Sequence, residues 1–390
     1  MRQFLDNIKK PFEKGGKYER FFPLIDALDT FLYTPGHATH SGSHIRDAVD
    51  LKRTMFTVIV ALLPALLFGM FNVGYQHFLA IGTSASHLDS FLYGATQVLP
   101  IVLVSYAAGL GVEFVFCIIN RHAIQEGFLV SGLLIPMIMP IETPLWMIAI
   151  ATAFAVLFAK EVFGGTGMNV FNVALIARAF LFFAYPTKMS GDKVWVALDG
   201  QNAVDGFTGA TALGDLSALT AESSSDALLQ VTAKYPLWDA FIGTIPGSIG
   251  ETSKLCILIG AAILLLTRVA SWKTMISFFF GGFLMSVLFT IWGANPYMQL
   301  APWHQIMLGG FMFGGVFMIT DPVSSAQTEQ GKYIYGFLAG FLAILIRVFN
   351  PAYPEGVMMA ILFMNAMAPM IDHYVIGANI NKRLNRKKQA

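Results

Sequence analysis

Residues 55–75 read MFTVIVALLPALLFGMFNVGY, an unbroken run of 21 residues without a charged side chain. A transmembrane helix needs about 20 apolar residues to cross the hydrocarbon core of a bilayer. Residues 90–112 form a second run of this kind. In the whole chain 55% of residues are hydrophobic and 13% are charged, and the mean hydropathy is +0.61. The sequence therefore indicates a polytopic membrane protein.

Further apolar runs bring the expected number of transmembrane helices to about ten. They cover residues 127–141, 143–159, 170–186, 255–267, 274–294, 305–320, 334–346 and 356–371. Several of them are near or below the length of a full crossing. The first run begins after about fifty mostly polar residues, so no cleavable signal peptide is expected. The expected fold class is an all-α polytopic membrane protein.

The basic residues predict which side of the membrane each end faces, because Lys and Arg accumulate on the cytoplasmic side. Nine of them precede the first span, and five lie in the last nine residues. Both termini are therefore expected in the cytoplasm, which requires an even number of spans. Threading ten spans also places Arg121, Lys160, Arg268, Lys273 and Lys332 on that side. The connections 76–89 and 295–304, which carry no Lys or Arg, then fall outside.

The expected organisation follows from this topology. Five spans in each half would invert the second half relative to the first, as in transporters with inverted repeats. We expect a cytoplasmic N-terminal segment (1–53), a first five-helix half (54–186), an external loop (187–236), a second five-helix half (237–376) and a basic cytoplasmic tail (377–390).

The external loop carries the heptad Asp205-Gly206-Phe207-Thr208-Gly209-Ala210-Thr211. It resembles the signal at which a flavin transferase attaches FMN to a threonine through a phosphoester bond. A neighbouring glycine leaves room for a bulky phosphate and ring system. The alternative is an ordinary Gly/Thr turn. If the motif is functional, Thr211 is the attachment site and Thr208 is a nearby hydroxyl that is not modified.

Placing a carboxylate at membrane depth costs free energy, so each such residue is a candidate functional residue. Glu113 lies in the cytoplasmic third of the second span. Glu113 is either a functional carboxylate or a structural residue. In the second case it pairs with Arg121 or extends to the membrane surface from the end of the span. Asp321 and Asp372 lie at cytoplasmic span ends, where solvation is easier.

Residues 160–172 read KEVFGGTGMNVFN, and three glycines interrupt the apolar region. Such backbone must line a cavity or find partners within the protein. We expect Asn169 and Asn172 to share a face of the next helix and to bind a planar ligand with an imide edge. The alternative is a glycine hinge with Asn169 as the helix N-cap.

Several classes of site are not expected. The glycines at 243, 247 and 250 lack the preceding strand of a dinucleotide-binding loop and would contact a phosphate only through backbone, so no NADH site is expected. The two cysteines, Cys117 and Cys256, are too few for an iron–sulfur cluster, and a disulfide between them is not expected. No metal cofactor and no nucleic-acid partner are expected.

Over almost the whole chain, the sequence resembles the B subunits of sodium-translocating NADH:quinone oxidoreductases. The related D subunits of Rnf complexes share the FMN signal, but an N-terminal extension of this kind fits the B subunits better. The stretches that carry the resemblance are 33–36, 46–53, 160–167, 178–186, 206–213, 245–251, 320–324 and 350–356.

The resemblance implies a redox pump of the bacterial inner membrane with subunits A to F. This chain would assemble with subunits A, C, D, E and F and would receive electrons from them. It would form two inverted five-helix halves, like the urea channels. FMN would be attached to Thr211 by the flavin transferase, and riboflavin would be held noncovalently near Asn169 and Asn172. Electrons would pass to ubiquinone, coupled to Na+ export.

The resemblance also implies roles for single residues. Glu113, Asp321 and Asp372 match acidic positions associated with sodium passage. The quinone region would include Gly109 and Glu126, although Leu110 replaces the second glycine of the family's Gly-Gly pair. The alternative functions are an Rnf-type D subunit and a channel or transporter of similar architecture without a redox role.

The topology predicts that a Ser224→Cys variant reacts with a membrane-impermeant thiol reagent in intact cells, because loop 187–236 should face away from the cytoplasm. Labelling is compared with that of the parent chain, which carries only Cys117 and Cys256. Reaction only after lysis would contradict the ten-span topology.

Overall fold

The computed structural model describes residues 51–120, 127–200, 203–205, 207–219, 225–350 and 356–389, with scattered positions before residue 46. Every regular element in this part of the chain is a helix. Six helices are long and apolar enough to cross a membrane, which agrees with the expected all-α membrane protein. They are α3 (Leu51–Ala80), α4 (His87–Asn120), α6 with its extension (Leu145–Phe163), α13 (Trp272–Trp292), α16 (Glu329–Phe349) and α17 (Val357–Gln389).

The other four expected spans are short helices. They are α5 (Phe128–Met137), α7 (Val173–Ala184), α12 (Lys254–Leu266) and a broken segment of α14 (Pro302–Met307), α15 (Phe311–Phe313) and the π-helix η5 (Gly314–Met318). At 1.5 Å per residue α5 is about 15 Å long, half the thickness of the hydrocarbon core. Each apolar run is therefore helical, but within the described residues only six helices reach spanning length.

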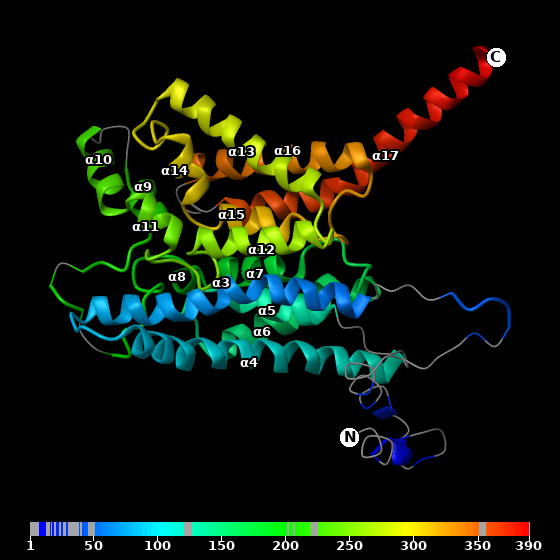
Figure 1. Cartoon of the computed structure of the whole chain (residues 1–390), viewed down its shortest axis with the longest axis horizontal. Helices are drawn as coiled ribbons and strands as arrows, with labels where there is room; N and C mark the ends of the chain where they lie inside the picture. Colours follow the sequence, from blue (N-terminus) through cyan, green and yellow to red (C-terminus); the bar gives the residue numbers. More distant parts are fainter. Residues whose placement is uncertain are drawn as a thin grey trace.

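Part of the packing of the first half recurs in the second, although the extensive contact of α3 with α4 has no comparable counterpart between α12 and α13. Helix α4 packs on α5 and α6, and α13 packs on α14 and α16 in the same way. The pair α6 and α7 corresponds to the pair α16 and α17. Figure 1 shows the halves as two layers, with α12 beside α3 between them. This recurrence is the arrangement expected of a repeated five-helix unit.

Glycines let the long helices approach one another closely. A Cβ atom at Gly340 of α16 would overlap the carbonyl oxygen of Phe278 in α13, and one at Gly281 would overlap that of Phe337. Likewise, a Cβ atom at Gly94 of α4 would overlap the carbonyl oxygen of Met70 in α3. Small residues at helix contacts are the usual solution in membranes, where lipid competes equally for apolar surface.

The region between α7 and α12 lies at one end of the bundle. It holds α8 (Pro186–Met189), α9 (Ala212–Ser217), α10 (Ser225–Lys234) and α11 (Leu237–Ile242). Val204 N donates to Ala80 O at the end of α3 (2.9 Å), and Tyr93 of α4 donates to Asp199 (2.5 Å). Figure 1 shows the start of α3 and the end of α17 at the opposite end of the bundle. The loop therefore lies at the other end of the helices from the start of α3 and the end of α17 (Figure 1); Ser224 lies outside the described residues.

The basic residues gather at the other end. Arg268, Lys273 and Lys332 line one surface depression there. Helix α17 continues without a break to Gln389, so the segment predicted as a separate tail extends the last helix. Most of the N-terminal segment 1–53 lies outside the described residues.

Close packing of α13 and α16 predicts that Gly340→Ala lowers the stability of the protein. Its new methyl group meets backbone, which cannot move aside alone, so we expect a loss of about 1–3 kcal/mol, as for other overpacked cores. Gly111→Ala in α4 is the control, because nothing lies within 4 Å of its Cβ position. The measurement is the midpoint of thermal unfolding in detergent; equal midpoints for the two variants would contradict this account of the packing.

Candidate functional site

A cavity of about 220 Å³, here called the loop-side pocket, lies between the region 187–236 and the helices α7 and α12. Its wall includes Thr211 and the backbone around Gly247. The heptad and the glycine-rich loop, far apart in the sequence, therefore meet at one cavity. Gly206 of the heptad lies outside the described residues.

Thr211 is the N-cap of α9, and its Oγ1 accepts a hydrogen bond from Gly214 N (3.2 Å). Tyr235 holds the preceding backbone, because its hydroxyl lies 2.9 Å from Ala210 O. Burial, and then the nearby Asp215 carboxylate, raises the pKa of Tyr235 far above its usual range, so the phenol keeps its proton. Thr208 is exposed, accepts a hydrogen bond from Lys234 Nζ (3.2 Å) and is not part of the pocket wall. Thr211 is therefore the threonine presented to the cavity.

The floor of the loop-side pocket is charged. Arg178 of α7 donates to Ile138 O, just after α5, and lies 3.4 Å from Glu251 Oε1. Lys254 Nζ donates to the backbone oxygens of Glu251 (2.7 Å), Thr252 (3.1 Å) and Gly309 (3.3 Å). These cations satisfy backbone groups at the ends of short helices, which lipid could not do.

Two hydroxyl groups in this wall have no partner within the described part of the chain. Ser248 Oγ and Thr252 Oγ1 are buried and make no hydrogen bond there. Buried polar groups are normally satisfied, so each points to a group that binds in the cavity. The wall therefore fits a ligand with polar edges next to Thr211.

A second cavity of about 90 Å³, here called the Asn169 pocket, lies between α3, α5, α12 and η5. Apolar side chains such as Leu134, Leu264 and Phe317 form part of its wall. Its polar wall residues are Thr54, Ser131, Lys160, Thr166, Asn169, Asn172, Thr320 and Asp321. The Thr166 hydroxyl oxygen is buried and has no hydrogen-bond partner in the described chain. An apolar cavity with a few polar groups is typical of sites for flat organic ligands.

The glycine stretch shapes this pocket. The π-helix η3 (Val156–Lys160) and the short 3-10 helix η4 (Glu161–Phe163) end α6, and Gly164, Gly165 and Gly167 follow with φ of +115°, +95° and +90°. Only glycine adopts these angles without strain. The other π-helix, η5, borders the same pocket through Phe317. Single π-turns within helices occur frequently at functional sites.

The prediction that Asn169 and Asn172 share a helix face was wrong. Helix α7 begins at Val173, and Asn172 is its N-cap, with Oδ1 accepting from Ala174 N (3.1 Å) and Leu175 N (3.2 Å). Asn169 lies in the loop before the helix and donates to Phe171 O (3.1 Å), so the alternative of Asn169 as N-cap was also wrong. The backbone at Asn172 is extended (φ −65°, ψ 121°), so the helix begins only at the next residue, Val173. Both residues still line the same pocket.

Glu113 pairs with Lys160, a partner not predicted from the sequence. Their side chains form a buried ion pair, with Glu113 3% and Lys160 4% exposed. The Lys160 ammonium also lies 5.9 Å from the centre of the Phe128 ring, against which Gly109 packs. The residues predicted for sodium and for quinone therefore adjoin one another, and Lys160 connects them to the Asn169 pocket. Arg121 and Glu126 lie outside the described residues.

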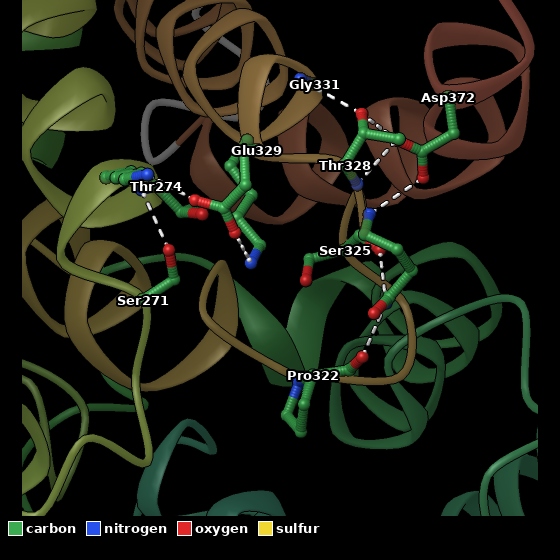
Figure 2. Close-up of polar contacts among 11 residues, drawn as sticks. Ser271, Thr274, Pro322, Ser325, Thr328, Glu329, Gly331 and Asp372 are labelled. Atoms are coloured by element: carbon green, nitrogen blue, oxygen red, sulfur yellow. Dashed lines mark hydrogen bonds and ion pairs between the residues drawn. The ribbon is translucent and has the colours of Figure 1, made fainter. Parts of the chain in front are cut away.

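The two remaining acidic candidates lie in different surroundings. Asp321 lines the Asn169 pocket and accepts hydrogen bonds from Val323 N (3.1 Å) and Ser324 Oγ (2.8 Å). Figure 2 shows Asp372 of α17 reaching the loop before α16. It accepts from Gln327 N (2.7 Å), Thr328 N (2.9 Å) and Thr328 Oγ1 (2.5 Å). Asp372 thus anchors the start of α16 and is not part of the Asn169 pocket.

Sequence reasoning missed Lys160, Thr166, Ser248 and Thr252 as members of these sites. Lys160 alone carried a signal, since it begins the charged pair Lys160-Glu161 between the apolar run 143–159 and the glycine-rich residues 164–167. Both cysteines are free, and the described residues contain no cluster of three or more His, Cys, Asp or Glu that could hold a metal ion.

Comparison with known proteins gives full-length similarity. Residues 38–381 match the family described as NQR2, RnfD, RnfE. Proteins named as the B subunit of Na(+)-translocating NADH-quinone reductase are similar to this chain. The protein from Chromohalobacter salexigens is 47% identical over 99% of this chain and 96% of its own length. Those from Stutzerimonas stutzeri and Pseudomonas aeruginosa are 46% and 45% identical, each over 99% of both chains.

The cap at the start of α7 predicts that Asn172→Ala lowers stability. Removing an N-cap oxygen costs about 0.5–2 kcal/mol, and Asn172 Oδ1 accepts from two backbone N–H groups of α7. Asn172→Ser keeps a capping oxygen and should lose less. The measurement is the thermal unfolding midpoint; an alanine variant as stable as the serine variant would contradict the capping role.

Proposed function

The chain belongs to the NQR2, RnfD, RnfE family, and we propose that it is the B subunit of a Na+-translocating NADH:quinone oxidoreductase. Similarity to proteins named as this B subunit, along 96–99% of their length, supports the proposal. It also favours a B subunit over the Rnf-type D subunit. The presentation of Thr211 to a polar cavity is the observation on which the redox role rests.

In this proposal FMN is joined to Thr211 Oγ1 through its phosphate and extends into the loop-side pocket. The backbone of 245–248 borders the phosphate, and the Ser248 and Thr252 hydroxyl groups give the ring system its polar partners. Arg178 and Lys254 in the floor supply hydrogen-bond donors, and Asp192 and Glu251 in the same wall supply acceptors. A flavin supplies the capacity to accept one or two electrons.

The Asn169 pocket is the proposed site of the noncovalent riboflavin. Its apolar wall suits the flat ring, while Asn169, Thr166 and Lys160 offer polar contacts at the edge. Asn172 acts mainly by capping the start of α7. The two cavities lie toward opposite ends of the helices, so the two flavins would be separated across the membrane.

The remaining assignments complete the proposed path. Subunits A, C, D, E and F of the same complex supply the NADH-oxidising end, because this chain shows no dinucleotide-binding pattern. Ubiquinone binds near Gly109 and Glu126, and Na+ uses Glu113 and Asp321. Asp372 is a weaker sodium candidate, because backbone and hydroxyl donors already engage its carboxylate. The chain lies in the bacterial inner membrane as ten inverted-repeat segments with cytoplasmic termini.

A simple channel is the competing function, and the centre of the protein does not favour it. Lys254 at the start of α12 donates hydrogen bonds to three backbone carbonyl oxygens, one of them that of Gly309. Arg347 donates a hydrogen bond to Gln305 O. The guanidinium of Arg347, which is buried and stays charged, repels Na+ from a central route at the junction of the halves. Sodium passage in this chain is therefore proposed near Glu113, away from the axis between the halves.

The proposal predicts that Thr211→Ala abolishes the ultraviolet fluorescence of the denatured chain in a gel, whereas Thr208→Ala keeps it. Thr208 is the matched control, because it carries the same hydroxyl three residues earlier but is not part of the pocket wall. Intact mass gives the direct readout: only the Thr211 variant should lack the mass of FMN less water. Loss of that mass in the Thr208 variant alone would contradict the assignment.

A further inference from the structure

A surface depression of about 630 Å³, here called the basic depression, lies between the turn from α12 to α13 and the start of α16. Its wall holds three cations, Arg268, Lys273 and Lys332, and one carboxylate, Glu329. Figure 2 shows the start of α13, marked by Ser271, beside the start of α16, marked by Glu329. We propose that the basic depression binds the phosphate headgroup of an anionic membrane lipid.

The charges in this wall leave a net positive site. Lys273 and Lys332 both form an ion pair with Glu329, so one carboxylate offsets one of two ammonium groups. Arg268 adds a further positive charge. Within the described part of the chain, no side chain forms an ion pair or a hydrogen bond with its guanidinium. A guanidinium can donate two parallel hydrogen bonds to the oxygens of a phosphate group.

The backbone at Arg268 is unusual for an arginine. Helix α12 ends with hydrogen bonds from Arg268 N to Leu265 O (3.1 Å) and from Val269 N to Leu264 O (3.0 Å). This ending places Arg268 at φ +59°, a left-handed conformation that glycine usually adopts at this position. Such an outlier indicates a use for the side chain, although a cation also favours the negative end of a helix. Lipid binding and stability must therefore be measured separately.

Aromatic side chains place the basic depression where the membrane meets water. Trp272 and Tyr333 are both exposed, and their ring centres lie 6.2 Å apart. Lys273 Nζ lies 5.8 Å from the centre of each ring. Trp and Tyr are enriched at the membrane surface, and Lys and Arg that cluster beside transmembrane helices attract anionic lipids. These surroundings favour a lipid over a soluble phosphate.

An apolar surface for an acyl chain continues from the basic depression. Trp272, Ile276 and Phe280 follow one another at intervals of four residues on α13, and all three are exposed. Residues at this spacing share a helix face. Because α13 begins at the depression, this face leads away from the charged headgroup site along the helix. Headgroup and acyl chain of one lipid would thus both have a surface to contact.

The test is photo-crosslinking of the assembled complex in detergent with a phosphatidylglycerol that carries a photoreactive group in its acyl chain. Peptide mass spectrometry should locate the label on α13 or α16. Excess unlabelled phosphatidylglycerol should remove this label, whereas phosphatidylcholine and inorganic phosphate should not. Competition by inorganic phosphate would indicate a site for a free anion, and equal competition by phosphatidylcholine would show that net charge does not matter. Either result, or a label found only on other helices, would overturn the proposal.

Two variants should change the labelling in opposite directions. Arg268→Gly should weaken it about fivefold at low lipid concentration, which corresponds to about 1 kcal/mol for one Lys or Arg near a membrane surface. Its unfolding midpoint should not fall, because glycine suits the backbone angle at this position. Glu329→Gln should strengthen the labelling by a similar factor, because it removes the one carboxylate in the wall.

Lys382→Gln is the matched control, because it removes one exposed positive charge from α17, at the same end of the bundle, but is not part of the wall. Its labelling should equal that of the parent complex. An equal loss in the Lys382 and Arg268 variants would indicate general attraction to the surface and overturn the proposal. A lower unfolding midpoint with unchanged labelling in Arg268→Gly would also overturn it, because Arg268 would then be structural. If Arg268→Gly does not assemble, Glu329→Gln decides: stronger labelling supports the proposal, and unchanged or weaker labelling refutes it.

Discussion

Backbone groups at the ends of half-length helices must find partners inside the protein, because lipid offers none. Helix α5 ends at Met137, and the Arg178 guanidinium donates a hydrogen bond to the carbonyl oxygen of the next residue, Ile138. Lys254 donates a hydrogen bond to Gly309 O between α14 and α15, and Arg347 donates one to Gln305 O. Buried cations on α7, α12 and α16 thus hold the broken segments in place. Both cavities depend on these breaks, since continuous helices would leave no polar wall within the membrane.

This construction separates two kinds of chemistry. The loop-side pocket combines a threonine hydroxyl with charged side chains of both signs, which suits a tethered ligand with polar edges. The Asn169 pocket has a mostly apolar wall and one buried lysine that is paired with a carboxylate on another helix. Lys254 in the first pocket is held by three backbone oxygens, whereas Lys160 in the second is held by the carboxylate of Glu113.

The sequence predicted features that depend on local composition, and it failed where distant contacts decide. Apolar runs located α3, α4 and α13, because helix burial in lipid leaves a composition signal. The pairing of Glu113 with Lys160 joins residues 47 positions apart on separate helices, so no spacing rule could give it. Asn172 was misplaced because a cap and a first helical residue look alike in sequence. Asp372 resembled a solvated end residue, but the fold turns it toward the start of α16.

The central claim is that one chain holds two flavins toward opposite ends of its helices. A cryo-electron microscopy map of the assembled complex, detailed enough to show side chains, tests it most directly. The account predicts density continuous with Thr211 Oγ1 in the loop-side pocket and separate, unattached ring density beside Asn169 and Lys160. Density attached elsewhere, or side chains filling both cavities in the assembled complex, would contradict the claim.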